Sequence, residues 1–172
     1  MRIIIEPQLE LRLLQLNDAL ALESLREGYT AHRGEWLYHG SARDFIKARL
    51  QDYRDASGLC AGIFFQSVLA GVVITSIPPG SRSAQVDYML GNAYRGRGLM
   101  TKAVRAIVSY LFRDPNVESV KITPDAKNSK SCAVAERLGF TTESSITDAI
   151  DYGDAKGDML IYEAHRGTWR AA

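Results

Sequence analysis

The residues best suited to chemistry in this sequence form the string YRGRGLM, at positions 94–100. Two glycines and two arginines alternate there, and a long apolar run follows them. Glycine lets a backbone approach an anion without a Cβ in the way, and arginine adds a fixed positive charge that suits phosphate oxygens. The string therefore indicates either an anion-binding loop or a surface turn with solvated charges, and its surroundings must distinguish the two.

The neighbouring segments place this string between a strand and a helix. The sequence AQVDYML at 84–90 alternates as a strand does, and LMTKAVRAIVSYLF at 99–112 has apolar residues at helical spacing. The first turn of a helix offers unpaired N–H groups and the positive end of the helix dipole. A strand, a glycine loop and a helix in this order therefore predict a pyrophosphate site.

Two common phosphate-binding motifs do not fit this loop. The pattern GxxxxGK[ST] of nucleoside triphosphatases is absent from the chain. The dinucleotide pattern GxGxxG begins at Gly96 but fails at Thr101, where its last glycine should stand. The spacing that fits is R/Q-x-x-G-x-G/A, with Arg95 and Gly98 in the first two slots and Met100 in the last.

Hydrophobic periodicity and turn residues predict the elements that must position this loop. The other strands are expected at 9–16, at 59–77 as a hairpin turning at Gln66-Ser67, at 118–124, at 141–145 and at 159–165. The other helices are expected from Asn17 or Asp18, at 41–56 with Ser41 as the cap, and at 128–140. This order predicts an α+β fold with helices packed on a sheet.

An ordinary composition excludes several classes of protein. The chain has 172 residues, of which 46% are hydrophobic and 24% charged, and its net charge is +1. Such a chain suits one domain, residues 1–172, and offers no bulk attraction to nucleic acid or membranes. No apolar run could span a bilayer and no secretion signal pattern is present, so we expect a cytoplasmic protein.

A metal site is not expected. Cys60 and Cys132 stand in no CxxC pair, and the histidines at positions 32, 39 and 165 are scattered along the chain. We expect both cysteines to be small buried apolar residues rather than nucleophiles, because no histidine accompanies either in a recognisable pattern.

Two blocks of the sequence resemble a known family. YMLGNAYRGRGLMTKAV resembles motif A of the GCN5-related N-acetyltransferases (GNAT), above all the RimL/RimJ-like subgroup that modifies ribosomal-protein N-termini. NSKSCAVAERLGF resembles the family's N-x-x-S-x-x-x-x-E-x-x-GF helix, and the first and last strands are similar too. The resemblance covers nearly the whole chain and implies a mixed, mostly antiparallel sheet of about seven strands with helices on both faces.

The resemblance also implies acetyl-CoA as the donor of an acetyl group and an amine as the acceptor, which attacks directly in a ternary complex. The family separates its fourth and fifth strands, so the edge of strand 84–90 near Met89 and Leu90 would pair with the pantetheine arm. A backbone N–H near Leu90 would polarise the thioester carbonyl. The CoA pyrophosphate would be held by backbone N–H groups of Arg95, Gly96, Arg97, Gly98, Leu99, Met100 and Thr101.

Three side chains receive roles by the same resemblance. Gln85 stands at the family's glutamate position and cannot act as a base, so Asp87 on the same strand face is the candidate base, unless it is a structural carboxylate. Ser131 would bond the leaving thiolate where many relatives use a tyrosine, unless it bonds its own helix backbone. Asn128 would bond the pantetheine, cap the helix, or do both.

The acceptor is left open between a protein N-terminus and a small amine such as a polyamine, an antibiotic or an aminoacylated toxin. A non-catalytic acetyl-CoA-binding domain is a third alternative, because the family glutamate is missing. The segment 147–158 would attract a cationic acceptor or form a solvated loop, and Trp36 and Tyr38 would line the acceptor side or pack two helices together. The acidic residues of this segment are Asp148, Asp151, Asp154 and Asp158. The protein is expected to be a monomer or a homodimer.

Overall fold

The computed structural model describes residues 1–27, 40–151 and 156–170. The strands in these residues are β1 (Arg2–Glu6), β2 (Leu9–Leu13), β3 (Gly58–Phe65), β4 (Val68–Ser76), β5 (Ser83–Leu90), β6 (Ser119–Ile122), β7 (Thr141–Asp151) and β8 (Lys156–His165). The helices are α1 (Ala19–Glu27), α3 (Ala42–Arg54), α4 (Leu99–Leu111) and α5 (Ser129–Arg137), with short 3₁₀ turns at η1 (Leu16–Asp18) and η2 (Asn92–Tyr94). No helix in the described ranges is both long and apolar enough to cross a membrane.

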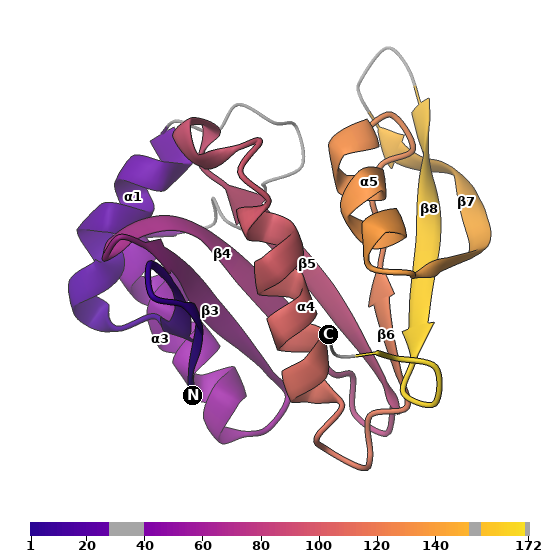
Figure 1. The fold of residues 1–172 in the computed structure, drawn as a ribbon, viewed down its shortest axis with the longest axis horizontal. Coiled ribbons are helices and arrows are strands. Elements are labelled where there is room, and N and C mark those ends of the chain that lie inside the picture. Colours follow the sequence, from indigo (N-terminus) through magenta and orange to yellow (C-terminus); the bar gives the residue numbers. More distant parts are fainter. Residues whose placement is uncertain (28–39, 152–155, 171–172) are drawn as a thin grey trace.

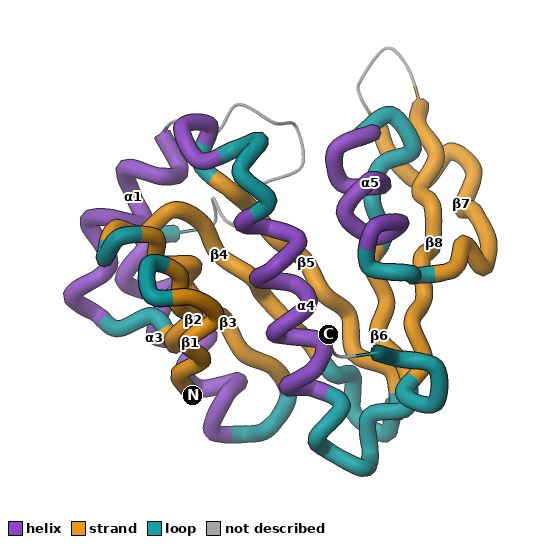
Figure 2. Tube along the Cα trace, in the orientation of Figure 1, coloured by secondary structure: helices purple, strands orange, loops and turns teal. Residues whose placement is uncertain are grey.

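The described strands form one eight-stranded sheet in the order β1-β2-β3-β4-β5-β6-β8-β7 (Figures 1 and 2). All neighbours pair antiparallel except β5 and β6, which are parallel. The α+β prediction is therefore confirmed, with one strand more than expected. The additional strand is β1, a five-residue edge strand. It is a strand because it pairs with β2. It was not predicted because so short a segment has little hydrophobic periodicity of its own.

Several local predictions are confirmed by the backbone. The Oγ of Ser41 accepts the N–H of Asp44 at 3.1 Å and so caps α3. Gln66 and Ser67 have φ of 51° and 65°, as a two-residue hairpin turn with both central residues left-handed requires. The closing strands β7 and β8 are longer than expected and extend to Asp151 and from Lys156.

The start of α1 differs from the prediction that Asn17 or Asp18 is its cap. The chain enters through η1, and the carboxylate of Asp18 accepts the N–H of Gln15 at 2.7 Å. The same carboxylate receives two hydrogen bonds from Arg12, at 2.7 and 2.8 Å. Burial opposes its ionisation, but the bonds from Arg12 and Gln15 outweigh this and lower the pKa of Asp18. Asp18 therefore does not cap α1, but links η1 to Arg12 of β2 through its carboxylate.

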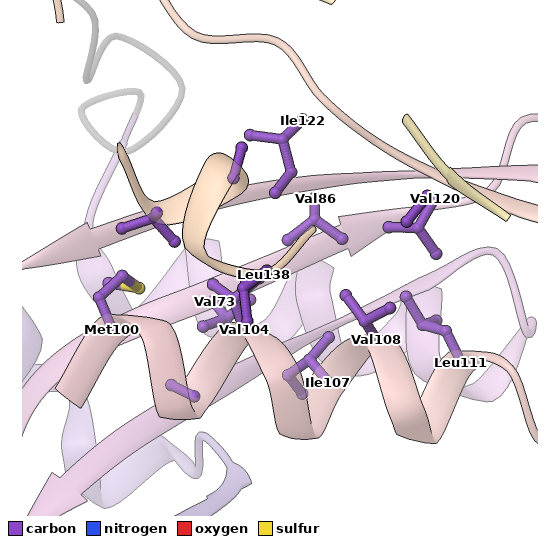
Figure 3. Packing of buried hydrophobic residues seen from close by; sticks show 14 of the residues in the cluster. Val73, Val86, Met100, Val104, Ile107, Val108, Leu111, Val120, Ile122 and Leu138 are labelled. Atoms are coloured by element: carbon purple, nitrogen blue, oxygen red, sulfur yellow. The ribbon is translucent and has the colours of Figure 1, made fainter. Parts of the chain in front are cut away.

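Two hydrophobic layers cover opposite faces of the sheet, because successive strand residues point to opposite sides. Val73 of β4 packs with α4 and α5, whereas its neighbour Val72 packs with α1 and α3. Figure 3 shows the first layer, in which the apolar face of α4 lies against strand side chains. The labelled residues are Met100, Val104, Ile107, Val108 and Leu111 of α4, with Val73, Val86, Val120, Ile122 and Leu138 around them. Helices on both faces are thus confirmed.

The only parallel pair in the described sheet ends early. β5 and β6 are in register through three pairs, the last of which is Gln85 with Lys121. β5 continues to Leu90 on its β4 side, where Leu90 pairs with Gly71. Residues 87–90 of β5 therefore have no strand partner on the β6 side among the described residues, and we call this stretch the open edge. Figure 1 shows β6, β7, β8 and α5 together on one side of it.

Candidate active site

The backbone of the open edge can be oriented from one hydrogen bond. The N–H of Gly91 donates to the carbonyl of Ala70 at 2.8 Å, on the β4 side. Groups along a strand alternate in direction, so the N–H and C=O groups of Leu90 and Tyr88 face away from β4, toward the open side. An extended, amide-rich chain could add there as an extra strand. Two residues were predicted for this contact. The backbone groups of Leu90 face the open side and could make it. The backbone groups of Met89 face β4 and its side chain is buried, 2% exposed, so Met89 cannot.

The side chains of the open edge divide between the two faces of the sheet, as their alternation predicts. Met89 packs in the layer of α1 and α3, and Asp87, two residues before it, points to that same face. Asp87 is half-buried and lies opposite Ile74 of β4. Tyr88 points to the other face, toward α4 and α5. The predicted base and the helix with Ser131 therefore lie on opposite sides of the sheet.

Ser131 is bonded to a tyrosine that sequence reasoning missed. Its Oγ lies 2.7 Å from the hydroxyl oxygen of Tyr88, and that hydroxyl also donates to the Ser131 carbonyl at 3.2 Å. Burial is the main reason that the pKa of Tyr88 rises to about 12, so the phenol is protonated at neutral pH. Many relatives have their tyrosine at the position of Ser131, whereas the phenol here comes from β5. The alternation of 84–90, which puts Tyr88 on this face, was the available signal.

Gln85 has a structural partner rather than a catalytic one. Its Nε2 donates to the Oγ1 of Thr123 at 2.8 Å, just beyond the last residue of β6. Two residues earlier on β5, the hydroxyls of Ser83 and Ser119 are 3.0 Å apart. These two bonds join β5 to β6 where the strands are still close, and the Tyr88–Ser131 contact follows where they have separated.

The glycine loop enters α4 in a conformation that only glycine adopts easily. Gly96 and Gly98 have φ of 75° and 72°, and Gly98 is the N-cap of α4 without a side-chain cap. A Cβ added at either would meet no atom within 4 Å, so their surroundings are open. The positive φ angles are therefore a reason for glycine at both positions. Close approach of an anion, which the sequence suggested, is a second reason. The first bond within the helix is made by Lys102, which leaves the N–H groups of Leu99, Met100 and Thr101 without a helical partner. The N–H of Arg95, also predicted to hold the pyrophosphate, instead donates to the carbonyl of Asn92 at 3.3 Å.

Three cationic side chains lie around this loop. Arg95 and Arg97 are exposed, and the guanidinium of Arg97 stacks over the ring of Phe65 with 5.8 Å to its centroid. Lys102, in the first turn of α4, is paired with Glu6 of β1. The side chains of Leu99 and Met100 are buried, so these two can contact a ligand only through their backbone. The loop is therefore an exposed, positively charged helix N-terminus, as an anion site requires.

Asn128 caps α5, as predicted. Its Oδ1 accepts the N–H of Ser131 at 3.2 Å. The cap uses only the oxygen, and the amide nitrogen is the atom with which Asn128 could bond a ligand. The predicted contact with pantetheine stays a prediction.

The acidic segment 147–158 is not simply a loop, because β7 runs through it to Asp151 and β8 begins at Lys156. The carboxylate of Asp158 accepts the N–H of Asp148 at 3.0 Å, which joins the two strands of this hairpin. Asp154, Trp36 and Tyr38 lie outside the described residues, so their predicted roles on the acceptor side are untested.

Both cysteines are buried, as expected. Cys60 is 2% exposed and burial raises the pKa of its thiol to about 12, while Cys132 is 8% exposed and burial raises its pKa too. Neither thiol is therefore a reactive thiolate at neutral pH. Among the described residues no group of three or more histidine, cysteine or acidic side chains could hold a metal ion.

Comparisons with known proteins identify the family to which the chain is similar. A family model for the acetyltransferase (GNAT) domain matches residues 8–141. YdaF of Bacillus subtilis (strain 168), provisionally named a ribosomal N-acetyltransferase, is 26% identical over 174 residues, which covers 96% of this chain and 95% of YdaF. The aminoglycoside N(6')-acetyltransferase type 1 of Klebsiella pneumoniae is 39% identical over 70 residues, 40% of this chain and 34% of that protein.

A solved structure shares the fold. RimL, a ribosomal L7/L12 alpha-N-protein acetyltransferase crystallised with coenzyme A, superposes with a TM-score of 0.85 at 22% identity. The superposition covers 96% of this chain and 98% of RimL.

Proposed function

The chain belongs to the acetyltransferase (GNAT) family and is an N-acetyltransferase, and from that premise we propose that it acetylates the N-terminal amine of a ribosomal protein. The observation that carries this acceptor is the similarity to YdaF, a relative named for ribosomal N-acetylation, along 96% of the chain. The proposal places the reaction in the cytoplasm, where ribosomes and acetyl-CoA meet.

Acetyl-CoA is the proposed donor, and three features support its binding. The exposed N-terminus of α4, with Gly98 as its cap and Arg95 and Arg97 beside it, suits a pyrophosphate. The open edge suits the amides of a pantetheine arm, because its backbone faces a side that no described strand covers. The N–H of Leu90 faces the same side, where it would donate to the thioester carbonyl oxygen as negative charge develops there.

The proposed reaction is a direct attack on the thioester. The amine nitrogen forms a bond to the carbonyl carbon, and the C–S bond breaks with its electron pair on sulfur. The proton lost by nitrogen passes through water to Asp87 and on to solvent, which returns one proton to the sulfur. Ser131 donates a hydrogen bond to the leaving thiolate. The positions of Asp87 and Ser131 on opposite faces of the sheet allow the amine to enter from one side while the thiol leaves toward the other.

The test is mass spectrometry of purified ribosomal proteins incubated with acetyl-CoA, with and without the enzyme. We expect N-terminal acetylation of at least one protein, strongly reduced with the variant Ser131→Ala. Ser145→Ala, an exposed serine of β7, is the matched control and should acetylate as the wild type does. Ribosomal N-termini that are unchanged by active enzyme would rule out this acceptor.

A small cationic amine is the second candidate acceptor. The similarity to an aminoglycoside N(6')-acetyltransferase over 70 residues favours it, as do Asp148 and Asp158 on the β7–β8 hairpin. A panel of aminoglycosides, polyamines and N-terminal peptides, assayed by release of the CoA thiol, separates the two. Turnover of small amines without turnover of peptides would replace the first proposal with this one.

A further inference from the structure

The contact between Tyr88 and Ser131 joins two elements that the sheet itself leaves apart. Tyr88 lies on the open edge of β5, beyond the last β5–β6 pair, and Ser131 lies in the first turn of α5. A serine near a helix start ordinarily bonds its own backbone. Here its Oγ is instead 2.7 Å from a phenol oxygen 43 residues away. The hydroxyl that would meet the leaving sulfur is therefore held by a side chain of the strand along which the donor would lie.

We propose that Tyr88 is a positioning residue for acetyl transfer: its phenol donates to the Oγ of Ser131 and so directs the proton of Ser131 toward the leaving sulfur of CoA. This rests on the proposed role of Ser131 as the group that meets the thiolate. Tyr88 does not touch the reacting atoms in this scheme and acts through Ser131 alone.

The hydrogen-bond geometry provides two settings for the pair. With no thiolate present, the Tyr88 hydroxyl can donate to the Ser131 carbonyl at 3.2 Å while the Ser131 hydroxyl donates to Tyr88. When a thiolate lies beside Ser131, the serine proton can turn to it, and the phenol proton can take the shorter contact of 2.7 Å to Oγ. A hydroxyl that accepts one hydrogen bond donates a stronger one, so the phenol makes Ser131 a better donor.

Tyr88 is suited to donate a hydrogen bond and unsuited to give up its proton. Its pKa is raised to about 12, chiefly by burial; the hydrogen bond with Ser131 lowers it, and the neighbouring Cys132, Asp87 and Tyr162 raise it. A free thiol has a pKa of about 8.5. Full transfer of the phenol proton to a thiolate is therefore uphill, and the sulfur receives its proton from solvent after the C–S bond has broken.

The inference can be tested without an acceptor by titrating the thiol of bound coenzyme A, using the ultraviolet absorbance of the thiolate. We expect wild-type protein to raise the ionisation constant of the bound thiol above that of free CoA, because Ser131 stabilises the thiolate. Tyr88→Phe should lower this constant about tenfold, by the value of one hydrogen bond. The dissociation constant of CoA, measured well below the thiol pKa, should stay the same.

A double-mutant cycle separates this role from a structural one. If Tyr88 acts through Ser131, then Tyr88→Phe has no further effect on the thiol once Ser131 is alanine. Tyr110→Phe is the matched control, because Tyr110 is a half-buried tyrosine of α4 that packs in the same hydrophobic layer, and it is not among the groups that shift the pKa of Tyr88. It should leave the thiol titration unchanged. Fluorinated tyrosine at position 88, a stronger donor of the same shape, should raise the ionisation constant above the wild-type value.

The outcomes distinguish this inference from the proposed function. If wild-type protein fails to bind CoA, the donor assignment and the inference both fall. If Ser131→Ala leaves the thiol as in the wild type, the role of Ser131 is wrong and the inference falls with it. If Ser131→Ala shifts the thiol but Tyr88→Phe does not, or if their effects add, only the positioning role of Tyr88 is overturned.

Discussion

The substitution Gly98→Ala, which adds one methyl group, tests the proposed anion-binding loop. Gly98 is the N-cap of α4 with φ of 72°, and an added Cβ would meet nothing within 4 Å. The cost of Gly98→Ala therefore comes from the backbone alone, about 1–2 kcal/mol for an L-residue held in the left-handed region. Alanine can relieve this strain only by rotating the entrance to the helix, which would turn the N–H groups of the first turn away from the proposed pyrophosphate site.

Gly80 is the matched control. It has φ of 73°, its added Cβ would also meet nothing within 4 Å, and it lies in the turn between β4 and β5. We expect both alanine variants to lose about 1–2 kcal/mol of unfolding free energy in guanidinium titrations. Only Gly98→Ala should weaken acetyl-CoA, by about fivefold, which corresponds to the roughly 1 kcal/mol of an anion at a helix N-terminus.

Isothermal titration calorimetry with acetyl-CoA measures the second effect. Equal loss of affinity in both variants would show that general destabilisation, rather than the shape of this loop, weakens binding. A Gly98→Ala protein as stable as the wild type would refute the argument from φ itself.

Three further predictions concern the base, an ion pair and the core. Asp87→Asn should lower kcat about a hundredfold, the usual value of a general base, with acetyl-CoA affinity unchanged; an unchanged kcat in steady-state assays would remove Asp87 from that role. The pKa of Asp18 is lowered in the folded protein, so the stability that it contributes is present above its unfolded pKa of about 3.9 and is lost as pH falls through the folded pKa. Denaturant titrations from pH 7 downward should therefore show wild type losing more stability than Asp18→Asn, and parallel curves would contradict this sign. Ile107→Ala, at a fully buried position of α4, should cost about 2–5 kcal/mol in the same titrations, and a cost near zero would mean that the layer of Figure 3 repacks.

Most of the proposed donor side could be predicted from the sequence, because it depends on local backbone preferences. Gly96 and Gly98 before an apolar helical pattern indicate a helix that begins with exposed N–H groups, and the structure has that helix from Leu99. The helix cap at Ser41 and the hairpin turn at Gln66-Ser67 could be predicted equally well, since a cap or a tight turn depends on about four consecutive residues. Alternation along 84–90 placed Asp87 and Tyr88 on opposite faces without reference to any other part of the chain.

Local sequence preferences therefore specify the loop, the helix that follows it and the faces of the strand before it. Long-range packing sets where β5 and β6 separate, the bond of Gln85 to Thr123 and the contact of Tyr88 with Ser131. These contacts join residues 38 and 43 positions apart. Their geometry depends on how a parallel pair twists and diverges between packed layers, and no periodicity within either segment carries that information.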